Sequence, residues 1–225
     1  MHVLLTDADR DLVSKAVTEA EAQTSGEIVT IVARRSDSYH DVGLSWAAAA
    51  AFIALALAAA FPQHVRALLS MMLRDWDHEL ADWKLLTGLL GLAILKFLIV
   101  RYMLTIMPLR MVMTPRATKA RRVRRRAILL FRTAAEARTR GRTGVLIYLS
   151  LDEHRAEIVA DRAINDKVAP EAWGAAMAAL IDAIRAGRPG EGMADAVTQV
   201  GAVLAPHFPR DDDDINELPD RLILL

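Results

Sequence analysis

Two apolar stretches decide the organisation of this chain: GLSWAAAAAFIALALAAAF (Gly43–Phe61) and LLTGLLGLAILKFLIV (Leu85–Val100). The first runs for 19 residues without a charge, and Lys96 is the only charged residue in the second. At about 1.5 Å per helical residue, the first stretch nearly spans a hydrocarbon core of roughly 30 Å. Only a short polar segment separates the two. The sequence therefore predicts a transmembrane hairpin over residues 42–110, inserted into a soluble domain.

The charge balance of the chain conceals a strong segregation. The 225 residues carry 28 basic and 28 acidic side chains, yet 12 Lys/Arg and a single acid lie between Arg110 and Arg142. The loop Gln63–Lys84 holds only three Lys/Arg. Because basic residues stay on the cytoplasmic side of a membrane, we expect the soluble domain and both termini to be cytoplasmic. The lack of cysteine excludes disulfides and thiol catalysis, and the N-terminus lacks the features of a cleaved signal peptide.

The apolar stretches leave some alternatives open. A buried helix of a soluble protein is the other interpretation of Gly43–Phe61, of which 10 residues are alanine. Lys96 and Arg101 in the second helix mark either a functional position or side chains that snorkel to the interface, which we favour. Pro108 is expected to kink or end that helix. The connecting loop has one apolar stripe, which predicts a short helix in the headgroup region: Val65, Leu69, Met72, Trp76, Leu80 and Trp83.

The remaining segments read as alternating helices and short apolar strands. A capped helix starts at Thr6, and the β-branched run Glu27–Ala33 is a strand that we expect to be covered on both faces. Further along the chain we expect two strands that form a hairpin and then two helices: Thr143–Ser150, Ala156–Asp161, Glu171–Ala186 and Glu191–Ala205. The predicted fold class is α/β, a small mixed sheet flanked by helices and interrupted by the two-helix hairpin. Its parts are residues 1–41 and 111–209, followed by an acidic tail at 210–225.

A basic amphipathic helix is predicted for Arg116–Arg140. Five arginines crowd its polar side and are candidate contacts for anionic lipid: Arg121, Arg122, Arg124, Arg125 and Arg126. Arginine runs also suit nucleic acid, but no separate set of aromatic residues for base stacking accompanies these. The cluster directly follows a membrane helix, where basic residues are attracted to anionic headgroups. We therefore predict lipid contact and no nucleic acid.

Several soluble segments together resemble a known family. They are SGEIVTIV (Ser25–Val32), RTGVLIYLS (Arg142–Ser150), RAEIVAD (Arg155–Asp161), two helices before Phe208-Pro209, and NELPD (Asn216–Asp220). This set resembles the TPM domain, in particular the bacterial subgroup in which membrane helices split the domain. The resemblance implies an α/β sandwich in a multi-pass protein of the bacterial inner membrane. It also implies links to phosphatase activity, to divalent-metal binding and to maintenance of membrane protein complexes.

The chain departs from the common pattern of that family at two places. Many members carry Asp-Asn-Gly before the second strand, where this chain has Arg142-Thr143-Gly144. Many also carry a Gly-x-Gly turn after the third strand, where this chain has Asp161-Arg162-Ala163.

Acidic residues at the ends of the predicted strands are the best candidates for chemistry. Glu27 starts the first strand, Asp161 ends the third, and Asp166 lies just beyond. Carboxylate oxygens of this kind suit Ca²⁺ or Mg²⁺. The alternative is that these carboxylates cap turns and helices. Sequence motifs for a P-loop, a nucleophile elbow or a dinucleotide fold are absent.

Two functions from different classes follow from these observations. The first is a non-catalytic, membrane-anchored module that binds or assembles a membrane protein partner at the cytoplasmic face. The second is a metal-dependent phosphatase tethered to the membrane. The first is favoured, because the chain has a clear anchor and no convincing nucleophile or general base.

Overall fold

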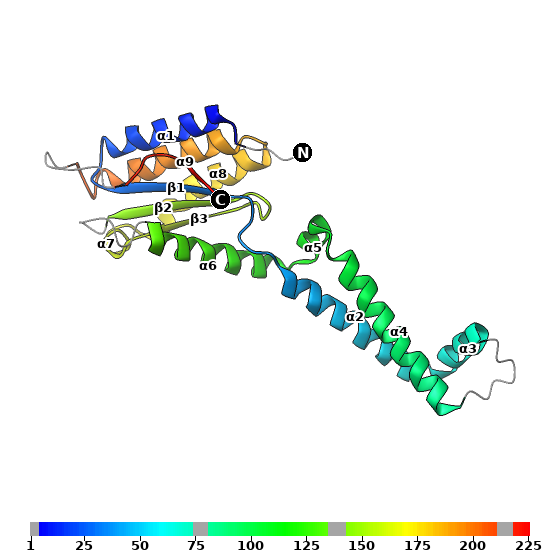
Figure 1. Ribbon diagram of the computed structural model, residues 1–225. Helices are drawn as coiled ribbons and strands as arrows, with labels where there is room; N and C mark the ends of the chain where they lie inside the picture. Colours follow the sequence, from blue (N-terminus) through cyan, green and yellow to red (C-terminus); the bar gives the residue numbers. More distant parts are fainter. Residues whose placement is uncertain (1–4, 74–80, 135–142, 211–217) are drawn as a thin grey trace. The chain divides into compact units, whose positions relative to one another are not determined.

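The computed structural model describes residues 5–73, 81–134, 143–210 and 218–225 (Figure 1). They divide into two compact units. Unit 1 comprises Met1–Asp37 and Arg116–Leu225, and unit 2 comprises Ser38–Pro115. The second unit is thus an insertion in the sequence of the first.

Unit 1 is built on a sheet of four strands in the order β3-β2-β1-β4. β1 (Glu27–Ala33) lies in the interior of the sheet, parallel to β2 (Gly144–Ser150) and to β4 (Ile223–Leu224). β3 (Arg155–Ala160) pairs with β2 in antiparallel orientation. The predicted mixed sheet is confirmed. β4 was not expected, because it consists of two residues at the end of a segment that reads as an acidic tail.

Helices cover both faces of this sheet (Figure 1). On one face lie α1 (Asp7–Glu21), α8 (Gly174–Arg185) and α9 (Pro189–Leu204). On the other lies α6 (Arg116–Ala134), which buries Val123, Ala127 and Phe131. Successive residues of β1 and β2 enter the two cores in turn, which is why both strands read as continuously apolar. The predicted sandwich of helices around a sheet is confirmed.

The ends of several elements differ from the sequence expectations. The segment after Pro170 begins with a 3-10 turn, Pro170–Trp173, before α8, and α9 starts at Pro189 rather than at residue 191. The short helix α7 (Arg162–Asn165) follows β3 directly. A proline suits the first turn of a helix, where no intrahelical N–H is needed, so α9 starts there.

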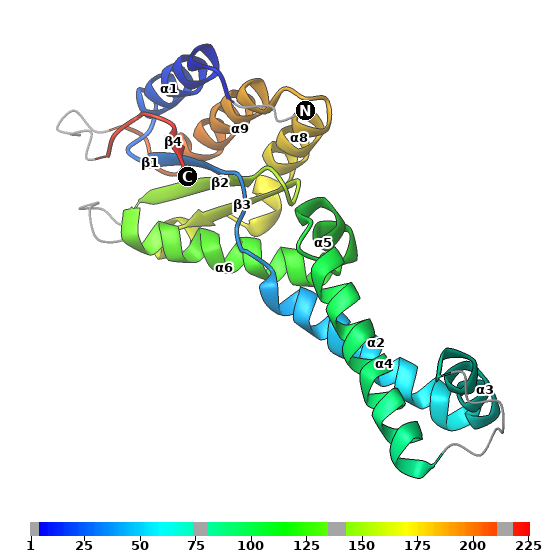
Figure 2. The same cartoon turned by 45° about the vertical axis from the view of Figure 1, so that its right-hand side comes forward.

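Unit 2 contains α2 (His40–Ala60), α3 (Pro62–Leu73), α4 (Asp82–Met103) and α5 (Met107–Met113), with α2 packed along α4 (Figure 2). α2 and α4 are long and apolar enough to cross a membrane by length and composition. Only 22% and 6% of their most apolar windows are buried. Most side chains in these windows are therefore exposed in unit 2.

The end of the second apolar helix differs from expectation. α4 ends at Met103, and turn hydrogen bonds from Thr105 and Ile106 separate it from α5. Pro108 lies in the first turn of α5, so it opens a new helix instead of ending the long one. Lys96 is exposed, while the Arg101 guanidinium lies against α2, with Nη1 3.5 Å from where a Cβ on Gly43 would stand.

A buried arginine on α5 connects the first and last segments of unit 2. Arg110, on α5, donates from Nε to the Leu104 carbonyl at 2.6 Å and from Nη1 to the Ser38 carbonyl at 2.8 Å. Its Nη1 also lies 3.3 Å from His40 Nδ1. These contacts join the residues before α2, the end of α4 and α5.

Candidate functional site

The predicted metal ligands occupy one end of the sheet in unit 1. Glu27 lies opposite Gly144 in the register of β1 and β2, and Asp161 follows the last residue of β3. Both side chains are buried, at 6% exposure each. The strand register thus brings Glu27 and Asp161 to the same end of the sheet, next to Gly144.

Backbone groups already occupy oxygens of these two carboxylates. Asp161 Oδ2 accepts a hydrogen bond from Gly144 N at 3.0 Å, and Asp161 N donates back to the Gly144 carbonyl at 2.9 Å. Glu27 Oε2 accepts from Leu218 N at 3.2 Å. Burial of a carboxylate is tolerated where such donors replace water. Both side chains therefore join strands and the C-terminal segment to each other.

Asp166 lies apart from this arrangement. It is exposed and pairs with Arg162 one turn earlier, at 3.7 Å between Arg162 Nε and Asp166 Oδ2. Among the described residues, no group of three or more His, Asp or Glu side chains could hold a metal ion. The metal site at Glu27, Asp161 and Asp166 stays a prediction.

A second carboxyl cluster at this end of the sheet was missed from the sequence. Glu21, in the last turn of α1, accepts a hydrogen bond from Ile28 N at 2.8 Å. Its carboxyl group also forms a hydrogen bond with the side chain of Asp220. Asp220 also accepts from Thr18 Oγ1 at 2.6 Å. The sequence signal for it was the NELPD segment. Its last residue, Asp220, contacts α1 although the two are about 200 residues apart in the sequence.

Burial raises the pKa of Glu21 to about 8. Desolvation is the main cause, and the nearby Glu27 and Asp220 carboxylates add to it, while the hydrogen bond from Ile28 lowers the pKa. A protonated Glu21 can donate to Asp220 and still accept from the backbone. The neutral form therefore holds the C-terminal segment against α1 and β1.

We expect this segment to loosen as pH rises from about 4.5 to about 8. The folded state keeps a proton on Glu21 that the unfolded state, with the ordinary pKa of 4.5, releases. The contribution to stability is present below pH 4.5 and is lost as pH rises through the folded-state value. Hydrogen exchange of residues 218–225 in the full chain, corrected for the intrinsic pH dependence of exchange, measures this loss.

The substitution Glu21→Gln is expected to flatten that pH profile, because glutamine donates and accepts without titrating. Glu19→Gln, on the exposed side of the same helix, is the matched control and should leave the profile unchanged. A wild-type protection that rises with pH over this window would contradict the expectation.

The arginines of α6 fall into two groups. Arg122 pairs with Asp37, 3.0 Å between Nη1 and Oδ2, and Arg124 lies 3.7 Å from Glu157 on β3. Burial raises the pKa of Glu157 above its ordinary value, although Arg124 and Arg155 lower it. Arg121 and Arg125 are exposed like Arg124, but they pair with no acidic side chain of the described residues. The five candidate lipid contacts are thus not equivalent.

A buried polar network lies at the opposite end of β1 and β2. Ser150 Oγ donates to Glu153, which also accepts from Ser36 N at 2.9 Å, and Ser36 Oγ lies 3.0 Å from the Tyr148 hydroxyl. Burial raises the pKa of Tyr148, while hydrogen bonds to Ser36 and Ser150 lower it. Ser150 is fully buried, so its hydroxyl is not an accessible nucleophile, and the network holds the segment after β1.

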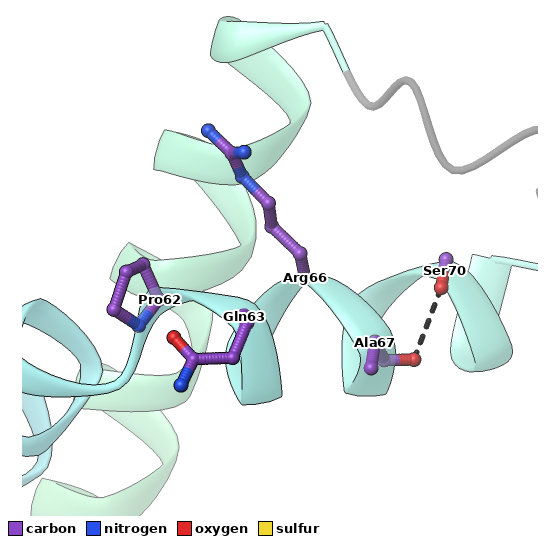
Figure 3. Close-up of a pocket in the computed structure, with 5 residues that line it drawn as sticks. All are labelled: Pro62, Gln63, Arg66, Ala67 and Ser70. Carbon is purple, nitrogen blue, oxygen red and sulfur yellow. Dashed lines mark hydrogen bonds between the residues drawn. The ribbon is translucent and has the colours of Figure 1, made fainter.

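Unit 2 contains a pocket along α3. Its lining is one face of the helix, with Arg66 and Gln63 extending to different sides (Figure 3): Pro62, Gln63, Arg66, Ala67 and Ser70. The Ser70 hydroxyl donates to the Ala67 carbonyl at 3.0 Å and is therefore satisfied within the helix.

α3 confirms a helix in the connecting loop. Trp76 and Leu80 of its predicted stripe, and residues 135–140 of the basic helix, lie outside the described residues.

Comparisons with known proteins agree with this fold. The family model of the TPM domain matches residues 105–203. The NMR structure of the BA42 protein from the psychrophilic bacterium Bizionia argentinensis is similar, with a TM-score of 0.57 and 20% sequence identity. The alignment covers 99% of this chain and 96% of that one. No curated protein matches the sequence. The match to the TPM domain supports a TPM-like module, and the similarity to BA42 is one of fold.

Proposed function

We propose that this chain is a membrane-anchored module that binds or assembles a membrane protein partner through its TPM-like domain. The observation that carries the proposal is the apolar, poorly buried surface of α2 and α4, inserted in the sequence of the α/β unit. Both long helices expose large apolar side chains along their length, such as Phe52, Ile53, Leu90, Ile94 and Leu98. Such surface is stable in lipid and costly in water.

The chemistry of unit 1 favours binding over catalysis. The Glu27 and Asp161 carboxylates accept backbone hydrogen bonds, and the Ser150 hydroxyl is buried against Glu153. These groups connect distant segments of the fold. A metal-dependent phosphatase, implied by the family resemblance, is the alternative, and its reaction would need carboxylates free to hold a metal at a cleft.

Affinity capture of the full chain from detergent extract tests the proposal. A defined membrane protein should be recovered with the full chain. Less of it should be recovered when a linker replaces Ser38–Pro115, because the domain is then no longer held at the membrane beside its partner. Extraction at alkaline pH, which removes peripheral proteins, should leave the full chain in the membrane. Release at alkaline pH would contradict the anchor, and metal-dependent phosphate release abolished by Asp161→Asn would favour the alternative.

The orientation of the hairpin is a separate prediction, based on the 12 Lys/Arg after it against three within its loop. The chain has no native cysteine, so single substitutions report one position each. Asp82→Cys, at the start of α4, should react with an impermeant thiol reagent added outside intact cells. Glu19→Cys, on α1, should react only after the cells are opened. The reverse pattern would place the domain outside.

A further inference from the structure

The outward side of α6 carries charge and apolar surface together. Val123, Ala127 and Phe131 bury the opposite side of the helix against the sheet. Four residues at spacings of four, four and three form a single stripe away from that core, here called the outer stripe: Arg121, Arg125, Leu129 and Arg132. All four are exposed, and Leu129 at 52%.

The outer stripe differs from the flanks of the helix in how its charges are used. Arg122 and Arg124 neutralise Asp37 and Glu157 within unit 1. Arg121 has a 3.5 Å contact with the Thr118 hydroxyl, and Arg125 makes no hydrogen bond or ion pair within the described residues. Arg121 and Arg125 thus present positive charge that no acidic side chain of the described residues neutralises.

The sequence position of α6 restricts what the stripe can meet. α6 begins at Arg116, the residue after Pro115, which is the last residue of the unit with the two candidate membrane spans. If those helices span a bilayer, the start of α6 is tethered within a residue or two of their unit. Attraction to anionic headgroups falls off within a Debye length of roughly 8 Å, and the short connection keeps α6 close to the membrane.

We propose that the outer stripe of α6 docks on the anionic surface of the bilayer, with Leu129 entering the boundary between headgroups and acyl chains. Arg121 and Arg125 contact lipid phosphates, while Leu129 gains by leaving water, as in interfacial amphipathic helices. Arg122 and Arg124 are left out of this contact because they lie on the flanks of the helix, beside Asp37 and Glu157. The inference rests on the membrane anchor proposed above and names the lipid chemistry that the domain recognises.

A reporter at position 129 tests the docking in the full chain. Leu129→Cys, labelled with an environment-sensitive fluorophore, is reconstituted in nanodiscs of phosphatidylcholine with or without phosphatidylglycerol. We expect a blue shift of its emission in the anionic discs and a water-like spectrum in the neutral ones. Leu12→Cys on α1, which covers the other face of the sheet, should stay water-like in both.

Charge variants separate the stripe from net charge. Arg121→Gln with Arg125→Gln should weaken docking about fivefold for each arginine removed, and high salt should act in the same direction. Arg162→Gln with Arg185→Gln removes two charges elsewhere on unit 1 and should leave the blue shift intact. An equal loss in this control overturns the proposal.

Other outcomes identify which proposal fails. If the chain enters nanodiscs but position 129 stays water-like in anionic discs, lipid docking is wrong and the anchor stands. If the blue shift appears equally in neutral discs, recognition of anionic lipid is wrong. A shift that needs an added acidic protein or nucleic acid would identify that partner instead. If the chain fails to enter nanodiscs, the anchor and the docking are both wrong.

Discussion

A chain in which a flexible Gly/Ser linker replaces Ser38–Pro115 is expected to be soluble and to unfold in one cooperative transition. All seven residues of β1 are buried, and β1 pairs with β2 on one side and β4 on the other (Figure 2). Both cores of unit 1 combine residues from the two flanking segments. The fold of this unit therefore needs residues before and after the insertion, and the described residues of the insertion supply none of its core.

The linker can be short, since the two ends of the insertion are linked within unit 1. Asp37, the last residue before the insertion, contacts Arg122, which lies six residues after the re-entry at Arg116. That separation is about 9 Å of helix, and ten linker residues reach roughly 33 Å when extended. Circular dichroism and dispersed amide resonances measure the outcome.

Residues 116–225 alone provide the decisive comparison. Without β1, the edge of β2 that pairs with it has no hydrogen-bond partner. Without α1, the side of α9 that packs on it is uncovered, as at Gly201, which lies beside Ala20. We expect aggregation or partial unfolding, because an apolar edge strand and an uncovered helix face are both unstable in water. A sharp two-state melt of this fragment would contradict the shared-core fold.

Arg110→Met is expected to separate α5 from the segments before α2 and after α4. Arg110 is buried and donates to the Leu104 and Ser38 carbonyls. Methionine keeps much of the volume but leaves both acceptors without this donor. The Leu104 carbonyl is the buried one of the two, and a buried unsatisfied group costs about 1–3 kcal/mol. The open state should therefore be populated about tenfold more, since about 1.4 kcal/mol is a factor of ten.

Thiol labelling of Met111→Cys measures this opening, because Met111 is buried beside Tyr39 and Val42. Labelling in detergent should accelerate strongly in the Arg110→Met background. Arg110→Lys should give an intermediate rate, since one ammonium group cannot reproduce the planar fork. Arg66→Met, an exposed arginine on α3, is the matched control and should leave the rate unchanged. Equal rates in all variants would show that Arg110 does not hold this region together.

The elements of this protein could be predicted from local patterns. The run of β-branched residues at Glu27–Ala33 and the apolar run at Gly144–Ser150 became β1 and β2, and the two charge-poor stretches became α2 and α4. The Thr6 capping box also formed. Each of these signals depends on residues within one or two turns, or on alternation along one strand, so the sequence contains them directly.

The partners of particular side chains depended on tertiary structure. The sequence grouped Arg121 to Arg126 as one lipid-binding cluster, whereas packing of α6 on the sheet turned Arg122 toward Asp37 and left Arg125 exposed. It grouped Glu27 and Asp161 with Asp166, although those two are buried and Asp166 is exposed and pairs with Arg162.

The C-terminal segment shows the physical reason most clearly. By composition it reads as a solvated acidic tail, yet Leu222 is buried, β4 extends the sheet and Asp220 meets Glu21 on α1. A strand of two residues is too short to show an alternating pattern in the sequence. The sequence also does not show which side chain a given carboxyl group will contact. Tertiary packing decided that β4 pairs with the edge of β1 and that Glu27 and Asp220 find hydrogen-bond donors there. These contacts join segments far apart in the sequence: Thr18 and Asp220 are separated by 202 residues.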